Sequence, residues 1–228
     1  MGTEIAFLRH AQSVGNLTDD YDRSDYNELS EGGHEQARRL VDPLVAFDPD
    51  RIVVSPTVRT RGTIRPTLRE TGRRAAVWPE LSEACWHPTH DDDPSATPQP
   101  GEPVDLPAEE AEYLDVTTAE FPACHPGDES YAEGLARLRL ARDRIEGVVS
   151  EDGETTLLVV GHAHANGRLI ELLLGMEPLG RFGFDNASLS TVIEPVPGVP
   201  DRRLAYSNRQ LAAVPDDEST RRCESGPE

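Results

Sequence analysis

Residues 5–10 read Ile5-Ala6-Phe7-Leu8-Arg9-His10, an apolar run that stops abruptly at a basic pair. A short, continuous apolar run of this kind is typical of a strand buried in the middle of a sheet. Two further apolar runs end in a similar way: Ile52-Val53-Val54 before Ser55-Pro56, and Leu157-Leu158-Val159-Val160 before Gly161-His162. Each of the three predicted strands therefore ends in residues suited to an anion or to catalysis.

Helical patterns alternate with these runs. We expect helices from Ser30 to about Val45, Thr57 to Thr71 with a kink near Pro66, Ala108 to about Glu120, Ser130 to Val149, and Asn166 to Leu174. Weaker strands are expected over 75–78, 188–194 and 203–207. This alternation predicts a three-layer α/β/α fold with a mostly parallel central sheet. Ligands bind outside the carboxyl ends of such strands, so neighbouring parallel strands would bring their terminal residues to one crevice.

The 228 residues are enough for one sizeable domain. We expect that domain over residues 1–215, with a lid or insert at about 87–123, rich in Pro and Asp, and a disordered polar tail at 216–228. No apolar run reaches eighteen residues, and the N-terminus lacks a basic segment followed by an apolar one. Three widely spaced cysteines do not suggest a disulfide framework. These features favour a cytoplasmic protein without a membrane span.

The charge balance is strongly acidic, with 42 Asp and Glu against 22 basic residues and a net charge of −20. Every basic residue is arginine, and lysine is absent. Two explanations are a salt-rich cytoplasm and a GC-rich genome that replaces Lys with Arg. The excess of acid favours the first, because salt screens the repulsion between crowded carboxylates. An acidic surface repels phosphate backbones, so we expect no nucleic-acid partner.

The strand-end residues suit phosphoryl transfer. Arg9 and Arg59 can each give forked, charge-assisted hydrogen bonds to phosphoryl oxygens. An imidazole such as His10 can attack phosphorus when one ring nitrogen is free and the other donates to a carbonyl. His162 can donate a further hydrogen bond, and a carboxylic acid can protonate the leaving oxygen.

These residues also carry a family resemblance. Leu8-Arg9-His10-Ala11-Gln12-Ser13, with Asn16, resembles the signature of the histidine phosphatase superfamily, the phosphoglycerate mutase-like enzymes. Further segments match its motifs in the family's order: 29–37, Ser55-Pro56-Thr57-Val58-Arg59 with Thr63, Leu81-Ser82-Glu83, Gly127-Asp128-Glu129-Ser130 with Arg137, Val160-Gly161-His162-Ala163, and Asn186-Ala187-Ser188. The resemblance implies a phosphoglycerate mutase-like fold and a metal-independent phosphatase without a cofactor.

The resemblance also implies roles for individual residues. His10 would be the nucleophile and would form a covalent phosphohistidine. Arg9, Arg59 and His162 would bind the transferring phosphoryl group, with a further contact from Asn16. Glu83 would protonate the leaving group and then activate water. The chain departs from the family at Ala11 and Ala163, where Gly is common, and in Ala84-Cys85-Trp86-His87, which replaces a Gly-x-x-Glu-Gly stretch.

Other functions remain open from the sequence. Cys85, His87, His90 and Asp91 are metal-ligand types lying close together, which would suit a metal-dependent hydrolase or a structural metal site, although their spacing fits no standard zinc pattern. A non-catalytic binding protein would require a lost nucleophile or lost arginines, and all are present. A mutase must shield its phosphohistidine from water, and the family's tyrosine-rich, lysine-bearing stretch is replaced here by a Pro-Asp loop. Hydrolysis of a small phosphate ester is therefore favoured.

Overall fold

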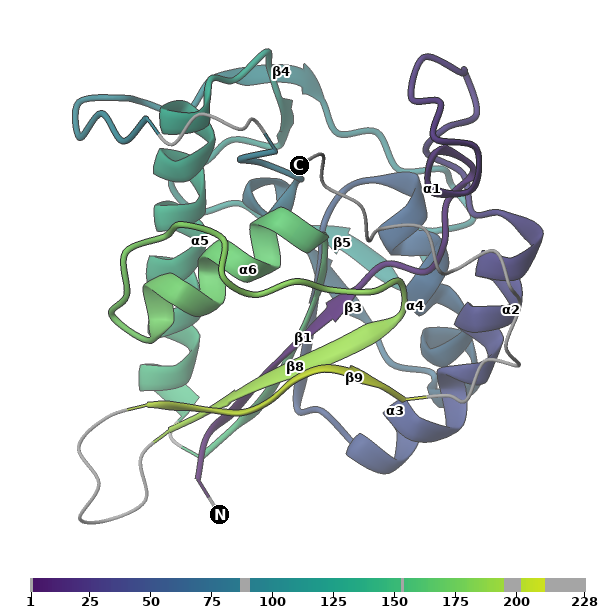
Figure 1. Ribbon diagram of the computed structural model, residues 1–228. Helices are drawn as coiled ribbons and strands as arrows, with labels where there is room; N and C mark the ends of the chain where they lie inside the picture. Colours follow the sequence, from purple (N-terminus) through teal and green to yellow (C-terminus); the bar gives the residue numbers. More distant parts are fainter. Residues whose placement is uncertain (1, 87–90, 153, 195–201, 212–228) are drawn as a thin grey trace, which may run out of the picture.

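The computed structural model describes residues 2–86, 91–152, 154–194 and 202–211 (Figure 1). Within these residues, seven strands form one sheet in the order β5-β3-β2-β7-β1-β8-β9. Their bounds are β5 Leu114–Val116, β3 Ala75–Val77, β2 Arg51–Val54, β7 Thr156–Gly161, β1 Glu4–Arg9, β8 Ser188–Ile193 and β9 Arg203–Gln210. The five strands from β5 to β1 are parallel, and β8 and β9 add an antiparallel edge. The mostly parallel sheet predicted from the sequence is confirmed.

The three strands with reactive ends are direct neighbours, in the order β2-β7-β1. Arg9 at the end of β1 is in register with Gly161 at the end of β7, and Val54 of β2 is in register with Val160. The residues that follow these strands therefore emerge at one edge of the sheet. This arrangement meets the condition under which the sequence predicted a common crevice.

Helices cover both faces of the sheet (Figure 1). One face carries α5 Tyr131–Asp152 and α6 Ala163–Leu173, and the other carries α2 Glu31–Arg39, α3 Val41–Phe47 and α4 Val58–Thr71. Side chains alternate along the strands, so Phe7 and Val159 pack under α5 and α6, whereas Leu8 and Val160 pack under the other helices. A short helix, α1 Val14–Thr18, and a 3-10 turn, η1 Pro79–Leu81, precede loops at the carboxyl edge. None of the helices in these described ranges is long and apolar enough to cross a membrane.

The helix expected from Ser30 to about Val45 is two helices, α2 and α3, separated at Leu40. Pro43 explains the break, because its ring would clash with the carbonyl of Arg39 in a continuous helix. Ser30 caps α2 by accepting a hydrogen bond from the N–H of Gly33, and Asp48 ends α3 in a left-handed conformation. The helix expected over 57–71 is α4, which runs through Pro66.

The helix expected over 108–120 is wrong. Residues 108–113 turn back on themselves, and Leu114–Val116 add β5 to the edge of β3. Burial decides this outcome, because Tyr113 and Leu114 are both buried against the sheet. The proposed lid is not all loop either, since β4 Pro100–Pro103 pairs with β6 Cys124–Pro126 in a separate two-stranded ribbon. His87 and His90, and the tail at 216–228, lie outside the described residues.

Gly33 permits close contact between α2 and the loop after His10. A Cβ built at Gly33 would lie 1.9 Å from the backbone oxygen of Gln12, whereas one at Gly147 in α5 meets nothing within 4 Å. We expect Gly33→Ala to destabilise the protein by about 1–3 kcal/mol, because the backbone must move apart. Gly147→Ala is the matched control and should stabilise by up to about 1 kcal/mol, because it removes a helix-interior glycine. Chemical denaturation of both variants measures these changes; an unchanged Gly33→Ala would contradict the contact.

Candidate active site

His10 lies at the carboxyl edge of the sheet, one residue after β1, and is 3% exposed. Its backbone N–H donates to the carbonyl of Gly161 over 3.0 Å, which ties the residue to β7. Its ring Nδ1 lies 2.7 Å from the carbonyl oxygen of Ala11. A carbonyl can only accept, so Nδ1 carries the proton and Nε2 keeps its lone pair. The imidazole is therefore held in the tautomer that a nucleophile requires.

We use the name crevice for the cluster of Arg9, His10, Arg59, Glu83 and His162, and the charges in this cluster keep the His10 imidazole neutral. Burial lowers its pKa well below the usual histidine value, and the nearby positive charges of Arg59 and Arg9 lower it further. The hydrogen bond to Ala11 opposes these effects without reversing them. At neutral pH the Nε2 lone pair is consequently available for attack.

His162 caps the N-terminus of α6, directly after β7, and is fully buried. Its ring centroid lies 5.3 Å from that of His10. Its Nδ1 lies 3.3 Å from a terminal nitrogen of Arg59, and its Nε2 lies 2.8 Å from the hydroxyl of Ser55. A guanidinium only donates, so Nδ1 accepts here and Nε2 donates to Ser55. Burial, Arg59 and His10 together lower the pKa of His162 well below its usual value.

Arg9 and Arg59 enter the same crevice from β1 and the first turn of α4. Arg9 donates to the carbonyl of Phe184 over 2.5 Å, and Arg59 donates to the side-chain oxygen of Asn27 over 3.0 Å. The Nε–H of each is buried without a hydrogen-bond partner, and neither forms an ion pair with any carboxylate in the described ranges. Two buried, incompletely satisfied guanidinium groups favour an anionic ligand between them.

Glu83 reaches the crevice from the loop after η1. Its Oε1 accepts hydrogen bonds from the N–H of Ala165, over 2.9 Å, and of Ala84, over 3.2 Å. The carboxylate thus satisfies an N–H in the first turn of α6, where the helix dipole also favours negative charge. Burial alone would raise the pKa of Glu83, but His164, the N–H of Ala165 and Arg59 outweigh it, so the net pKa is lowered.

Arg137 on α5 holds the loop that carries Glu83. Its side chain is completely buried and pairs with the buried carboxylate of Glu129 at 2.8 Å. The same guanidinium donates to the backbone carbonyls of Glu80, Ser82 and Glu83 over 2.7–3.1 Å. These hydrogen bonds hold the backbone of residues 80–83 in place, and so fix the position from which the Glu83 side chain extends.

The loop after His10 is anchored to α2. The N–H of Gln12 donates to the side chain of Gln36 over 2.8 Å, and the Ser30 hydroxyl donates to the Gln12 side chain over 2.7 Å. Asn16 lies one turn further on, and its Oδ1 accepts from the side chain of Asn186 over 3.0 Å. Asn186 also donates to the carbonyl of His10. Asn16 therefore belongs to the same hydrogen-bond network as the backbone of His10.

The structure brings all six predicted site residues to this edge: Arg9, His10, Asn16, Arg59, Glu83 and His162. It also adds residues that sequence reasoning gave no role, namely Gln36, Asn186 and His164. Gln36 and Asn186 were visible only as members of motifs. His164 could have been noticed as the second histidine of Gly161-His162-Ala163-His164. Residues two positions apart at the start of a helix point in different directions, so the two histidines can contact different neighbours.

Two members of the alternative metal set, His87 and His90, lie outside the described residues, so only Cys85 and Asp91 can be placed. No group of three His, Cys, Asp or Glu residues within the described ranges could hold a metal ion. Cys85 is buried and its thiol faces the carbonyl of Tyr131 at 3.7 Å, whereas Asp91 is exposed. Burial raises the pKa of Cys85 to about 12, which disfavours the thiolate that a metal requires.

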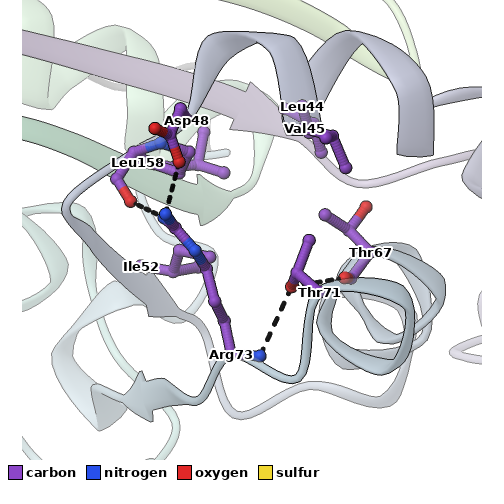
Figure 2. Close-up of a pocket in the computed structure, with 9 residues that line it drawn as sticks. Leu44, Val45, Asp48, Ile52, Thr67, Thr71, Arg73 and Leu158 are labelled. Atoms are coloured by element: carbon purple, nitrogen blue, oxygen red, sulfur yellow. Dashed lines mark hydrogen bonds and ion pairs between the residues drawn. The ribbon is translucent and has the colours of Figure 1, made fainter.

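A separate small cavity lies beneath α3 and α4, near the start of β2 (Figure 2). It is lined by Leu44, Val45, Asp48, Pro49, Ile52, Thr67, Thr71, Arg73 and Leu158. Arg73 reaches across to Asp48 and forms an ion pair with it. This cavity is at the opposite end of the strands from His10, and its lining contains no histidine or cysteine, so we assign the chemistry to the crevice.

Solved structures share this architecture. The chain resembles the α-ribazole phosphatase of Shigella flexneri with a TM-score of 0.62 and 19% identity, covering 94% of this chain and 100% of that one. It resembles the mycobacterial glucosyl-3-phosphoglycerate phosphatase in complex with VO3 with a TM-score of 0.61 and 20% identity, over 90% and 99%. The structure of mycobacterial hydrolase 2 is 25% identical to this chain, with a TM-score of 0.60, and the match covers 96% of this chain and 95% of that one.

A comparison with curated protein sequences gives no match. The family model of the histidine phosphatase superfamily, branch 1, matches residues 5–200, which include β1, β2, β7 and every residue of the crevice described above. The resemblance read from the sequence is confirmed, and the chain belongs to the histidine phosphatase superfamily (branch 1).

Proposed function

We propose that the chain hydrolyses a small phosphate monoester through a covalent phosphohistidine on His10. The observation that carries this proposal is a buried, neutral imidazole with a free Nε2 beside two guanidinium groups without carboxylate ion pairs in the described chain. The phosphatase structures similar to this chain support the same reaction class.

In the first step, Nε2 of His10 attacks phosphorus while the bond from phosphorus to the leaving oxygen breaks. Arg9 and Arg59 stabilise the charge on the equatorial oxygens, which is the main demand of phosphoryl transfer. Glu83, in its protonated form, gives its proton to the leaving oxygen. The product of this step is an alcohol and a phosphohistidine.

In the second step, the Glu83 carboxylate takes a proton from water as the water oxygen attacks phosphorus. The bond between phosphorus and Nε2 breaks, and its electron pair returns to the imidazole of His10. Inorganic phosphate leaves, and Glu83 is protonated again. One carboxyl group thus serves as acid and then as base.

His162 and Asn16 complete the phosphoryl site. Arg59 now donates to Nδ1 of His162, and a phosphoryl group would compete for that N–H. If Arg59 turns to the phosphate, the Ser55 hydroxyl can donate to Nε2 of His162 and leave Nδ1 to carry the proton toward phosphate. The second N–H of the Asn16 amide supplies a further contact, since its first donates to Tyr21.

Hydrolysis is favoured over mutase chemistry and over a metal-dependent reaction. The lid lacks the lysine-bearing stretch of the family's mutases. Two arginines already supply the positive charge that a metal ion would provide at the phosphoryl group. The strongly acidic composition further supports a cytoplasmic protein adapted to salt, without a nucleic-acid partner.

Replacement of the nucleophile tests the proposal. His10→Ala should lower turnover of an aryl phosphate more than about a thousandfold, measured with EDTA present, because the proposed mechanism loses its nucleophile. Rapid-quench trapping should give an acid-labile, base-stable phosphoenzyme with the wild type alone. His34→Ala, an exposed histidine on α2, is the control. Turnover by His10→Ala near the wild-type rate would refute the mechanism.

The role of Glu83 is tested by leaving-group dependence. Glu83→Gln should slow an alkyl phosphate about a hundredfold or more, and nitrophenyl phosphate far less, because a poor leaving group depends on the proton. Asp91→Asn, an exposed carboxylate of the lid, is the matched control and should retain activity on both. If both substrates slow equally in Glu83→Gln, a different group is the acid.

Salt dependence tests the adaptation proposed from charge. The melting temperature should rise from low to molar KCl, because the Debye length falls to about 3 Å and screens the repulsion behind the net charge of −20. The value of kcat/KM should not fall steeply, because screening also eases the approach of an anionic substrate. Thermal melts and initial rates across the salt series measure both. A flat or falling melting temperature would argue against salt adaptation and leave the chemistry unaffected.

A further inference from the structure

His164 lies beside the proposed acid and is not needed to bind phosphate. Its Nδ1 is 3.5 Å from Oε2 of Glu83, the oxygen that accepts no backbone hydrogen bond in the structure. The two side chains differ in their access to water, because Glu83 is 21% exposed and His164 is 50% exposed. The pair therefore connects the crevice to solvent through a single contact.

The reaction creates a specific demand for a proton. The first step requires a protonated Glu83, yet the resting environment favours the carboxylate: His164, the N–H of Ala165 and the charge of Arg59 all stabilise negative charge there. Imidazole is the side chain that exchanges protons near neutral pH. A proton held next to the carboxylate on an imidazole is available at a pH where the carboxyl alone would have lost it.

We propose that His164 holds the proton that Glu83 uses, so that the two side chains act as a relay between the crevice and solvent. This inference rests on the proposed function, in which Glu83 is the acid. His164 acts through Glu83 and touches neither the phosphoryl group nor the leaving group.

The relay balances over one turnover. In the proposed relay the proton starts on Nδ1 of His164, 3.5 Å from the carboxylate. A bound phosphate dianion repels the Glu83 carboxylate and competes with it for the positive charge of Arg59. The proton therefore moves from His164 to Oε2 of Glu83. It then passes to the leaving oxygen as the phosphorus–oxygen bond breaks. In the second step Glu83 takes a proton from the attacking water and returns it to His164.

The charged surroundings of the pair come from several elements. Arg59 on α4 and Arg9 on β1 both interact with the Glu83 charge, and Arg137 on α5 binds its backbone carbonyl. Cys85 also lies near Glu83, but burial raises the pKa of its thiol to about 12, so it stays neutral. Among the titratable groups in the described ranges, Glu83 is the one found in contact with His164.

The test is the pH profile of kcat/KM for an alkyl phosphate in His164→Gln, with His164→Asn as a second variant. Either amide can still donate a hydrogen bond to Glu83 but cannot exchange a proton. The alkaline limb should move to lower pH by about one unit or more, because the proton is then held by the carboxyl alone. At pH 7.5 the alkyl phosphate should slow by about tenfold or more, and nitrophenyl phosphate by less than about twofold. His34→Gln is the control.

A double-mutant cycle separates the relay from a structural role. In the Glu83→Gln background, His164→Gln should have no further effect, because no carboxyl remains to receive the proton. A rate lowered equally at every pH, an unshifted alkaline limb, or additive effects in the cycle would each overturn the relay. None of these results would affect the trapped phosphoenzyme or the leaving-group effect of Glu83→Gln alone, so failure of the relay is distinct from failure of the proposed function.

Discussion

The crevice depends on the burial of two positive charges that pair with no carboxylate among the described residues. Arg9 and Arg59 enter it from β1 and α4, and burial lowers the pKa of both, although Glu83 partly offsets the effect. An arginine remains charged even so. Their field, together with burial, keeps His10 and His162 neutral. The energetic strain of this arrangement is relieved by an anion, and a phosphoryl group has the charge and the oxygens to do so.

The fold stabilises these buried charges by holding the backbone around them in place. Parallel pairing of β2, β7 and β1 sets the three strand ends in line. The Gln36 side chain and the close approach at Gly33 hold the loop after His10, while the N-terminus of α6 binds the Glu83 carboxylate. The backbone around the crevice is therefore held in place, which limits the rearrangement that electrostatic stabilisation of a transition state would require.

Much of this could be predicted from the sequence, because apolar strands and the motifs at their ends are local signals. The sheet, α4, α5 and the convergence of Arg9, His10 and His162 follow from them. The helix break at Leu40 also has a local cause, since Pro43 disfavours a continuous helix there. Strand β5 was not, because 108–120 joins the sheet through the burial of Tyr113 and Leu114. The contact between His164 and Glu83 joins residues 81 positions apart, and the local pattern around neither residue predicts their pairing.

The hydrogen bonds of Arg137 go to backbone atoms, and this affects how the sequence can vary. The guanidinium binds the carbonyl oxygens of Glu80, Ser82 and Glu83, and every amino acid supplies the same carbonyl. These three contacts therefore do not depend on the side chains of the segment, although Glu80 also forms a buried ion pair with Arg144. The Ala84-Cys85-Trp86-His87 stretch, which departs from the family pattern, follows directly after the residues whose carbonyls Arg137 binds. Because Arg137 binds backbone carbonyls, the residues that follow Glu83 can differ from the family pattern while the backbone that carries the Glu83 carboxyl stays in place.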